Sequence, residues 1–223
     1  MKRWLCTLLM LILLTGSVCA APKQVALTFD DGPAGKPTER LLDGLAQRGI
    51  PATFFLCCYR ITEAPETVKR IAREGHELGV HGATHGYFTK MTDRQLRGEI
   101  LSTAQAIRDL TGQRPTLLRP PGGLYDDRVL ALCRESDFPV ILWTVDPEDW
   151  DPAQRSKTVR RVTERVKDGD VILLHDLSEE NTDAALAIAD RLAAQGYTFC
   201  TVSQLAREKG ISLAPGTVYR GFS

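Results

Sequence analysis

The chain has 223 residues, of which 43% are hydrophobic and 7% aromatic, and its 28 Lys and Arg residues are matched by 28 Asp and Glu residues. This balance excludes an intrinsically disordered polymer, a collagen-like repeat and a multi-span membrane protein. The even charge gives no support for nucleic-acid binding, which usually requires an excess of Lys and Arg. We therefore expect one globular domain.

The first twenty residues have the pattern of a secretory signal peptide. A basic start at residues 2–3 precedes an apolar run at 5–14, and small residues follow, with Ala20 as the expected last residue before cleavage. An uncleaved membrane anchor is the alternative, but the apolar run is short for a span of about 20 residues. We therefore predict a signal peptide at residues 1–20, export to a periplasm, a cell wall or the medium, and no stable membrane insertion after cleavage.

Along the rest of the chain, apolar runs of strand type alternate with segments of helical period. The expected strands lie at residues 24–29, 52–57, 77–80, 116–118, 140–145, 171–174 and 197–201. A helical pattern follows each strand, and the clearest one begins at a capping box formed by Thr92 and Gln95. This alternation implies parallel strands joined by crossovers, in an open doubly wound sheet or a barrel. The tail at 211–223 has no periodicity, so we expect it to be loosely packed.

Four cysteines would remain after cleavage, namely Cys57, Cys58, Cys133 and Cys200. An exported protein can oxidise them, and four cysteines allow three pairings. Each one lies within an apolar strand or helix face, so buried free thiols are an equally good alternative. No C-x-x-C spacing occurs, which argues against a zinc–cysteine site.

Polar motifs follow five of the expected strands. They are Asp30-Asp31 after the first strand, His81 and His85 after the third, Arg119 after the fourth, Asp149-Trp150 after the fifth and His175 after the sixth. Catalytic groups of parallel α/β folds lie at the carboxyl ends of the strands, so we expect these side chains to share one rim. Each motif alone has a simpler explanation, such as a turn, an exposed histidine pair or a neutralising arginine. Those explanations together would require five coincidences at the same rim.

This set of side chains meets the requirements of metal-assisted hydrolysis. Two imidazoles four residues apart and one carboxylate can hold a divalent ion and leave positions open for water. Such an ion polarises a carbonyl group and lowers the pKa of bound water. A second carboxylate can take the water's proton, and a histidine on the far side can protonate the leaving amine.

With these five motifs in order, the chain from about Val25 to Leu205 resembles the polysaccharide deacetylase family, the NodB-homology domain of carbohydrate esterase family 4. The resemblance implies a distorted (β/α)7 barrel, similar to a TIM barrel, at residues 21–205, with a C-terminal extension at 206–223. It also implies a hydrolase that removes N-acetyl groups from N-acetylglucosamine-type polysaccharides or oligosaccharides. The implied cofactor is one divalent metal ion, Zn²⁺ in the first place and Co²⁺ or Ni²⁺ as alternatives. The expected partner is an acetylated amino-sugar glycan; the oligomeric state stays open.

The resemblance implies a role for each charged group that would touch the substrate or the ion. Asp30 resembles the general base, and His175 resembles the general acid. The residues similar to the family's metal ligands are Asp31, His81 and His85.

Further residues match the groups that support this chemistry. Arg119 matches the arginine that orients the base, and Asp149 matches the residue that tunes the acid. Trp150 and Leu173 match the walls of the acetyl pocket. Gly122 stands where a backbone N–H helps to hold the oxyanion in the family.

Two glycines depart from the family pattern. Gly82 stands where the family usually has Ser or Thr after its first metal histidine, so we expect a supporting hydrogen bond to be lost and the metal to be held less firmly. Gly122 stands where the family commonly has an aromatic residue, so we expect a more open site that lacks one aromatic wall.

Two other functions compete with N-deacetylation. The same groups can hydrolyse an acetate ester, and no residue in the sequence separates amide from ester. A carbohydrate-binding protein that has lost catalysis is the other alternative, weakened because base, metal ligands and acid are all present.

Overall fold

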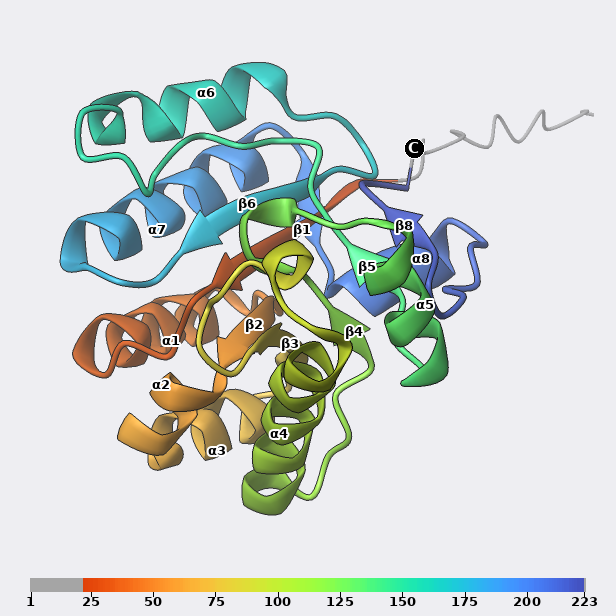
Figure 1. The fold of residues 1–223 in the computed structure, drawn as a ribbon. Coiled ribbons are helices and arrows are strands. Elements are labelled where there is room, and N and C mark those ends of the chain that lie inside the picture. The colour runs from red at the N-terminus through yellow and green to blue at the C-terminus, as the bar shows by residue number, and fades with distance from the viewer. Residues whose placement is uncertain (1–21, 223) are drawn as a thin grey trace, which may run out of the picture.

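The computed structural model describes residues 22–222, whose strands form one curved, parallel sheet with helices packed outside it (Figure 1). The strands are β1 (Lys23–Asp30), β2 (Thr53–Cys57), β3 (Glu77–Gly82), β4 (Leu117–Leu118), β5 (Val140–Ile141), β6 (Val171–His175), β7 (Tyr197–Phe199) and β8 (Val218–Tyr219). The helices are α1 (Lys36–Arg48), α2 (Cys58–Glu63), α3 (Pro65–Arg73), α4 (Asp93–Thr111), α5 (Asp127–Glu135), α6 (Thr158–Arg165), α7 (Glu179–Ala194) and α8 (Val202–Glu208). Three short 3-10 turns are η1 (Phe88–Lys90), η2 (Pro121–Gly123) and η3 (Arg155–Lys157).

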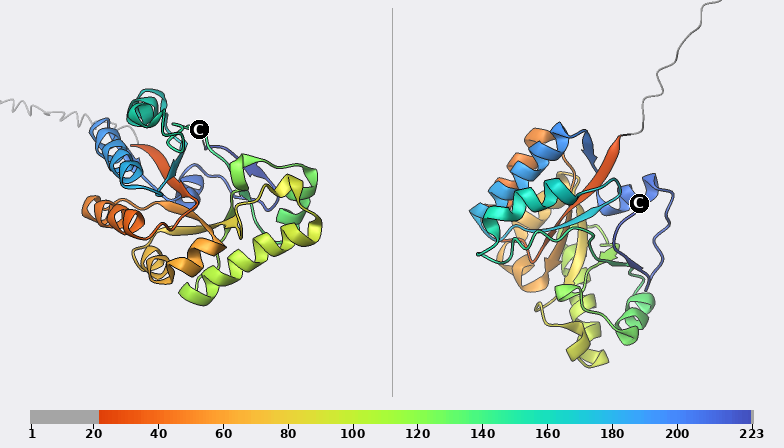
Figure 2. Two further views of the ribbon diagram at one scale, coloured as in Figure 1. Left: turned by 60° about the vertical axis from the view of Figure 1, so that its left-hand side comes forward. Right: turned by 90° about the horizontal axis from the view of Figure 1, so that it is seen from above.

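The strands follow the order β6-β1-β2-β3-β4-β5-β8, and β7 pairs with the beginning of β1. The curve closes between the segment after β5 and β6, where Val145 forms a parallel bridge with Ile172 and the Thr144 N–H donates to the Val171 carbonyl at 3.0 Å. The fold is thus a distorted (β/α)7 barrel, as the family resemblance implies (Figure 2). The seven expected strands are all present.

The central strand β1 is buried from Val25 to Asp30, because side chains fill the inside of the curve and helices cover the outside. The longest helix, α4, begins at the predicted capping box: the Thr92 side chain accepts from the Gln95 N–H, and the Thr92 N–H donates to the Gln95 side chain. Its buried face packs beside β3. Both elements therefore form a firm support for the loop that connects them.

The C-terminal tail differs from the expected loose extension. Strand β8 pairs in parallel with β5, with Val218 opposite Val140, and Phe222 is buried. The boundary expected at residue 205 falls inside α8. The sequence could not indicate this, because a two-residue strand is too short for a periodic pattern and is formed by its tertiary partner.

The predicted signal peptide at residues 1–20 lies outside the described residues. Within residues 22–222, none of the helices combines the length and the apolar character needed to cross a bilayer. The cysteines of this range are free thiols rather than disulfides, and three of them, Cys57, Cys133 and Cys200, are buried.

Candidate active site

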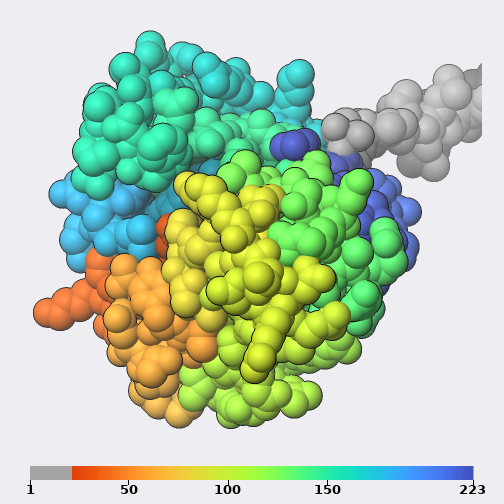
Figure 3. Space-filling model, in the orientation of Figure 1, coloured from red at the N-terminus to blue at the C-terminus, as the bar shows by residue number. Residues whose placement is uncertain are grey.

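The carboxyl ends of the strands surround a cavity of about 370 Å³. It is lined by Asp30, Asp31, His81, His85, Tyr87, Gly122, Trp143, Asp146, Trp150, Leu173 and His175. All ten predicted site residues meet here, since the two that do not line the cavity, Arg119 and Asp149, are hydrogen-bonded directly to residues that do. The segment after β3, which contributes His85 and Tyr87 to the lining, is yellow in Figure 3 and lies at the surface.

One oxygen of Asp31 faces two imidazole nitrogens. Its Oδ1 lies 3.1 Å from His81 Nε2 and 3.0 Å from His85 Nε2, and it is buried with no hydrogen-bond partner. His81 Nδ1 lies 2.7 Å from the Arg119 carbonyl, which can only accept, so this nitrogen carries a proton and Nε2 is the ring atom that faces Asp31. At these separations the Asp31 oxygen and the two Nε2 atoms require a proton or a cation between them.

The same three residues fit a divalent metal ion. Their ligand atoms all lie within 4.8 Å of one another. Among the His, Cys, Asp and Glu side chains of residues 22–222, these three form the cluster that is close enough to share one ion. Burial disfavours the charged carboxylate, yet the facing imidazoles of His81 and His85 hold the pKa of Asp31 far below its ordinary value. The close approach of Asp31 raises the pKa of His85, against the opposing effect of burial. The carboxylate is thus ionised and ready to bind a cation.

The backbone at two of these residues has an unusual conformation. Asp31 has φ 71° and His85 has φ 62°, in the left-handed region that residues with a side chain seldom adopt. Such conformations persist only where surrounding contacts enforce them, and they are common at ligand-binding sites.

Asp30, the last residue of β1, is held by a fully buried arginine. Arg119 Nη1 donates to Asp30 Oδ1 at 2.7 Å and to Thr28 Oγ1 at 2.8 Å. Its other nitrogens donate to the carbonyls of Ile141 (3.0 Å) and Leu142 (2.9 Å). One oxygen of Asp30 is therefore fixed, whereas Oδ2 lies 3.7 Å from His81 Nε2.

His175 ends β6, in register beside Asp30 of the neighbouring strand β1, and is paired with Asp149. Its Nδ1–H donates to Asp149 Oδ1 at 2.8 Å, and its backbone N–H donates to Oδ2 of the same carboxylate at 2.8 Å. The Nε2 atom lies 3.9 Å from Asp31 Oδ2. Burial disfavours the imidazolium, but the hydrogen bond and charge of Asp149, with the charges of Asp30 and Asp31, raise the pKa of His175 to about 9.

The apolar walls include a residue that the sequence interpretation missed. Trp150, which is 59% exposed, and Leu173, which is buried, both line the cavity. Gly122 has φ 63°, and a Cβ atom there would lie 3.1 Å from Tyr87 Cε1. The ring of Tyr87 therefore occupies part of the space beside Gly122 where an aromatic wall was expected to be absent. Tyr87 stands two residues after His85, and this closeness to an expected site residue could have indicated its place in the cavity.

Other supporting residues also escaped the sequence interpretation. Asn181 Nδ2 donates to Asp149 Oδ2 at 3.0 Å, which leaves this buried carboxylate fully bonded. Asp146 lines the cavity, and burial raises its pKa. Asp146 stands three residues before Asp149, directly after the expected strand at 140–145, and was therefore detectable. Nothing local to Asn181 distinguishes it from a surface residue of α7.

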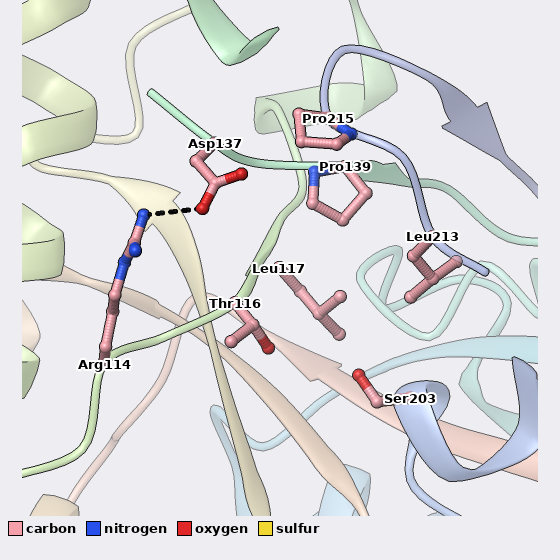
Figure 4. A pocket seen from close by; sticks show the side chains of 8 residues that line it. All are labelled: Arg114, Thr116, Leu117, Asp137, Pro139, Ser203, Leu213 and Pro215. Atoms are coloured by element: carbon pink, nitrogen blue, oxygen red, sulfur yellow. Dashed lines mark hydrogen bonds and ion pairs between the residues drawn. The ribbon is translucent and has the colours of Figure 1, made fainter. Parts of the chain in front are cut away.

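A second cavity, of about 360 Å³, lies near the amino ends of β4 and β5 (Figure 4). Its lining includes the ion pair Arg114–Asp137, whose Nη2 and Oδ2 atoms are 3.1 Å apart and whose side chains are largely exposed. The other lining residues are Thr116, Leu117, Pro139, Ser203, Leu213 and Pro215. This set holds no group of metal ligands, which lies instead at the opposite rim.

Comparison with known proteins places these residues in context. The family described as Polysaccharide deacetylase matches residues 17–141. The peptidoglycan-N-acetylmuramic acid deacetylase PdaC of Bacillus subtilis is 40% identical over 188 residues, which cover 84% of this chain and 39% of that protein. This chain thus spans about two-fifths of the length of PdaC.

Two further proteins are matched over nearly their whole length. A peptidoglycan-N-acetylglucosamine deacetylase of Bacillus cereus is 37% identical over 192 residues, covering 84% of this chain and 90% of that protein. The solved structure of a family 4 acetyl xylan esterase from Clostridium thermocellum, in complex with a cobalt ion, has a TM-score of 0.83 at 29% identity. That alignment covers 89% of this chain and 98% of the esterase.

Proposed function

The chain belongs to the polysaccharide deacetylase family, and on that premise we propose that it is a metal-dependent hydrolase that removes N-acetyl groups from an amino-sugar glycan. The observation that carries the proposal is the arrangement in one cavity of a held carboxylate, Asp30, a three-residue ligand set around Asp31, and a charged histidine, His175. A carbohydrate-binding protein without catalysis would not need all three.

The ligand set proposed for the divalent ion is Asp31, His81 and His85, in agreement with the unpartnered Asp31 oxygen. When bound, such an ion supplies Lewis-acid chemistry, which polarises a carbonyl and makes water more acidic. We propose Zn²⁺ as the native ion, with Co²⁺ or Ni²⁺ as alternatives, because a set of two imidazoles and one carboxylate suits these metals.

Asp30 is proposed as the general base. Arg119 fixes one carboxylate oxygen, which leaves Oδ2 to take a proton from the attacking water. The water oxygen forms a bond to the acetyl carbon, and negative charge develops on the carbonyl oxygen. We propose that the backbone N–H of Gly122 helps to hold that charge, since this residue lines the cavity.

His175 is proposed as the general acid. Its Nδ1–H is engaged by Asp149, so the proton on Nε2 is the one available to the substrate. As the C–N bond breaks, this proton passes to the sugar nitrogen, and the products are acetate and the free amine. A pKa of about 9 keeps the histidine charged at neutral pH.

We propose peptidoglycan as the glycan class, with action outside the cytoplasm after export. Support comes from the relatives in Bacillus subtilis and Bacillus cereus, both named as peptidoglycan deacetylases. The groove around Tyr87 and Trp150 offers exposed aromatic faces on which sugar rings can pack. O-deacetylation is the second candidate, because the chain is also similar to an acetyl xylan esterase over nearly its full length.

Acetate release tests the proposal. The purified protein is incubated with peptidoglycan, chitooligosaccharides and acetylated xylan, each with zinc, with a chelator, and with zinc restored after the chelator. We expect acetate from the amino-sugar substrates, lost with the chelator and recovered with zinc. The variant Asp31→Ala is the matched control, because it removes one ligand and leaves Asp30 and His175 in place.

Three results would contradict the proposal. Acetate from xylan alone would make the protein an O-acetyl esterase. Glycan binding without acetate release would favour the non-catalytic alternative. Full activity in the presence of chelator, or in Asp31→Ala, would reject the metal site.

A further inference from the structure

The loop between His81 and His85 is attached to a carboxylate that takes no part in the proposed chemistry. Glu99 lies in α4, and its Oε2 accepts from the N–H groups of Ala83 (2.6 Å) and Thr84 (2.8 Å). Its Oε1 accepts from the Thr84 hydroxyl at 2.8 Å. The side chain thus binds the two residues in the middle of the loop at three points.

The surroundings of Glu99 make these contacts specific. The residue is only 8% exposed, and none of the ion pairs within residues 22–222 includes it. A buried carboxylate without a cation is costly unless donors satisfy it, and here the donors are the loop itself. Helix α4 is held by its cap and its buried face, so the loop is bonded to a fixed support.

The absence of a side chain at Gly82 belongs to the same arrangement. Gly82 has φ 101°, and a Cβ atom there would lie 3.1 Å from Glu99 Oε2 and 3.0 Å from Phe88 Cε1. Glycine adopts this φ without strain and lets the carboxylate approach the loop. The hydrogen bond expected to be lost at Gly82 is therefore replaced by the three that end on Glu99.

The two imidazoles differ in how much they depend on this support. His81 is buried at the end of β3, and its Nδ1–H donates to the Arg119 carbonyl. His85 has a side chain that is 39% exposed and a φ of 62°, and it directly follows Thr84. The position of His85 relative to Asp31 therefore depends on the conformation of the loop.

We propose that Glu99 is a positioning residue that sets the place of His85 beside Asp31 and thereby the affinity for the divalent ion. This inference rests on the proposed metal site and adds a residue that binds neither ion nor substrate. Removal of groups that orient metal ligands typically weakens metal binding about 10- to 100-fold.

Zinc affinity and hydrogen exchange test the role of Glu99. The zinc Kd is measured by competition with a chromophoric chelator, and amide exchange at Ala83 and Thr84 is measured on the metal-free protein. Glu99→Ala should raise the Kd about 10- to 100-fold and accelerate both amides. Glu99→Gln keeps an oxygen acceptor, so it should lose distinctly less affinity than Glu99→Ala.

The matched control is Glu77→Gln, at the other end of β3. Glu77 Oε2 accepts from the Thr53 hydroxyl (2.9 Å) and the Ser203 N–H (3.1 Å), far from the ligand loop. This variant should leave the zinc Kd unchanged. If Glu99→Ala does not fold, Thr84→Val is the decisive variant, because it removes one hydroxyl donor to Glu99. It should weaken zinc binding and accelerate amide exchange at position 84.

Each other outcome overturns the inference. An unchanged Kd in Glu99→Ala, or in Thr84→Val if that variant is decisive, would show that the contacts do not position His85. Equal losses in Glu99→Gln and Glu99→Ala would assign the effect to charge rather than to positioning. Tighter zinc in Gly82→Ser would show that the loop lacks support. A native protein that binds no zinc would instead reject the proposed metal site, while the exchange rates would still report whether Glu99 holds the loop.

Discussion

On one side of the cavity, Arg119 and Asp149 are buried, and hydrogen bonds to named partners fix both groups and the residues they hold, Asp30 and His175. On the other side, Asp31 has an unpartnered oxygen, and His85 is partly exposed on a loop. In the proposed mechanism the first side transfers protons, which requires fixed geometry. The second side receives the metal ion in that mechanism, and its geometry is completed by what it binds.

The largest difference between the two sides should appear in Asp30→Asn and Asp31→Asn. An amide cannot accept the water's proton, so Asp30→Asn should lower kcat by about 10²- to 10⁴-fold while zinc still binds. Asp31→Asn should lose zinc, because the ligand charge is removed. Steady-state kinetics and elemental analysis measure the two effects. Near-native kcat in Asp30→Asn would mean that Asp30 is not the base.

The first side of the cavity, which holds Arg119 and Asp149, should also contribute more to the stability of the fold. Arg119→Met leaves the buried charge of Asp30 without its partner, and such changes typically destabilise a fold by about 3–5 kcal/mol. Arg114→Met is the control, because it breaks the exposed pair with Asp137 and should cost only about 0–1 kcal/mol. Urea denaturation gives both free energies of unfolding. Equal values would contradict the assigned difference between buried and exposed pairs.

A smaller effect is expected in the pH profile of Asp149→Asn. The acid must be charged, and the native kcat/KM should fall as pH rises through the His175 pKa of about 9. Without the Asp149 charge, burial lowers that pKa, so the basic limb should move to lower pH. Asp146→Asn is the control, because that carboxylate lines the cavity without a hydrogen bond to His175 and should move the limb less. A basic limb that stays in place in Asp149→Asn would show that Asp149 does not raise the pKa of His175.

The pairing of His175 with Asp149 also makes the free energy of unfolding depend on pH. The folded pKa of His175 is raised above the ordinary value of about 6.5, so the native state binds its proton more tightly than the unfolded state. The resulting stabilisation is complete below about pH 6.5 and is lost as pH rises through about 9. Asp149→Asn should therefore flatten the change in unfolding free energy across that range.

The smallest effect, a change in KM, is expected from Tyr87, which lines the cavity and is exposed. Tyr87→Ala removes an aromatic face, and contacts of this kind contribute about 0.5–1.5 kcal/mol, so KM for a glycan polymer should rise about 2- to 10-fold. Tyr87→Phe keeps the ring and should behave as the native protein. Hydrolysis of a small aryl acetate should change little in either variant. An equal loss on both substrates would place Tyr87 in the chemistry rather than in glycan binding.

The features that could be predicted from the sequence are those that repeat along it or form a recognisable motif. The alternation of strands and helices predicted a parallel sheet, open or closed, and the family resemblance selected the barrel. The motifs after the strands predicted the rim, because parallel strands bring their carboxyl ends together. The sequence could not give β8, which depends on pairing with β5. It could not single out Glu99, one of several charged residues in α4, because only the folded loop shows that this one is buried.

The buried thiols provide a chemical probe of folding that requires no engineered label. Cys57 lies in β2 and Cys133 in α5, and both are fully buried. Burial raises the pKa of Cys133 to about 12, and burial together with the charges of Asp31 and Asp30 raises that of Cys57, so neither side chain is a reactive thiolate in the folded protein. Alkylation at each site therefore reports the opening of its own region. Equal rates at the two sites would mean that β2 and α5 open together, whereas unequal rates would show which part of the barrel opens first.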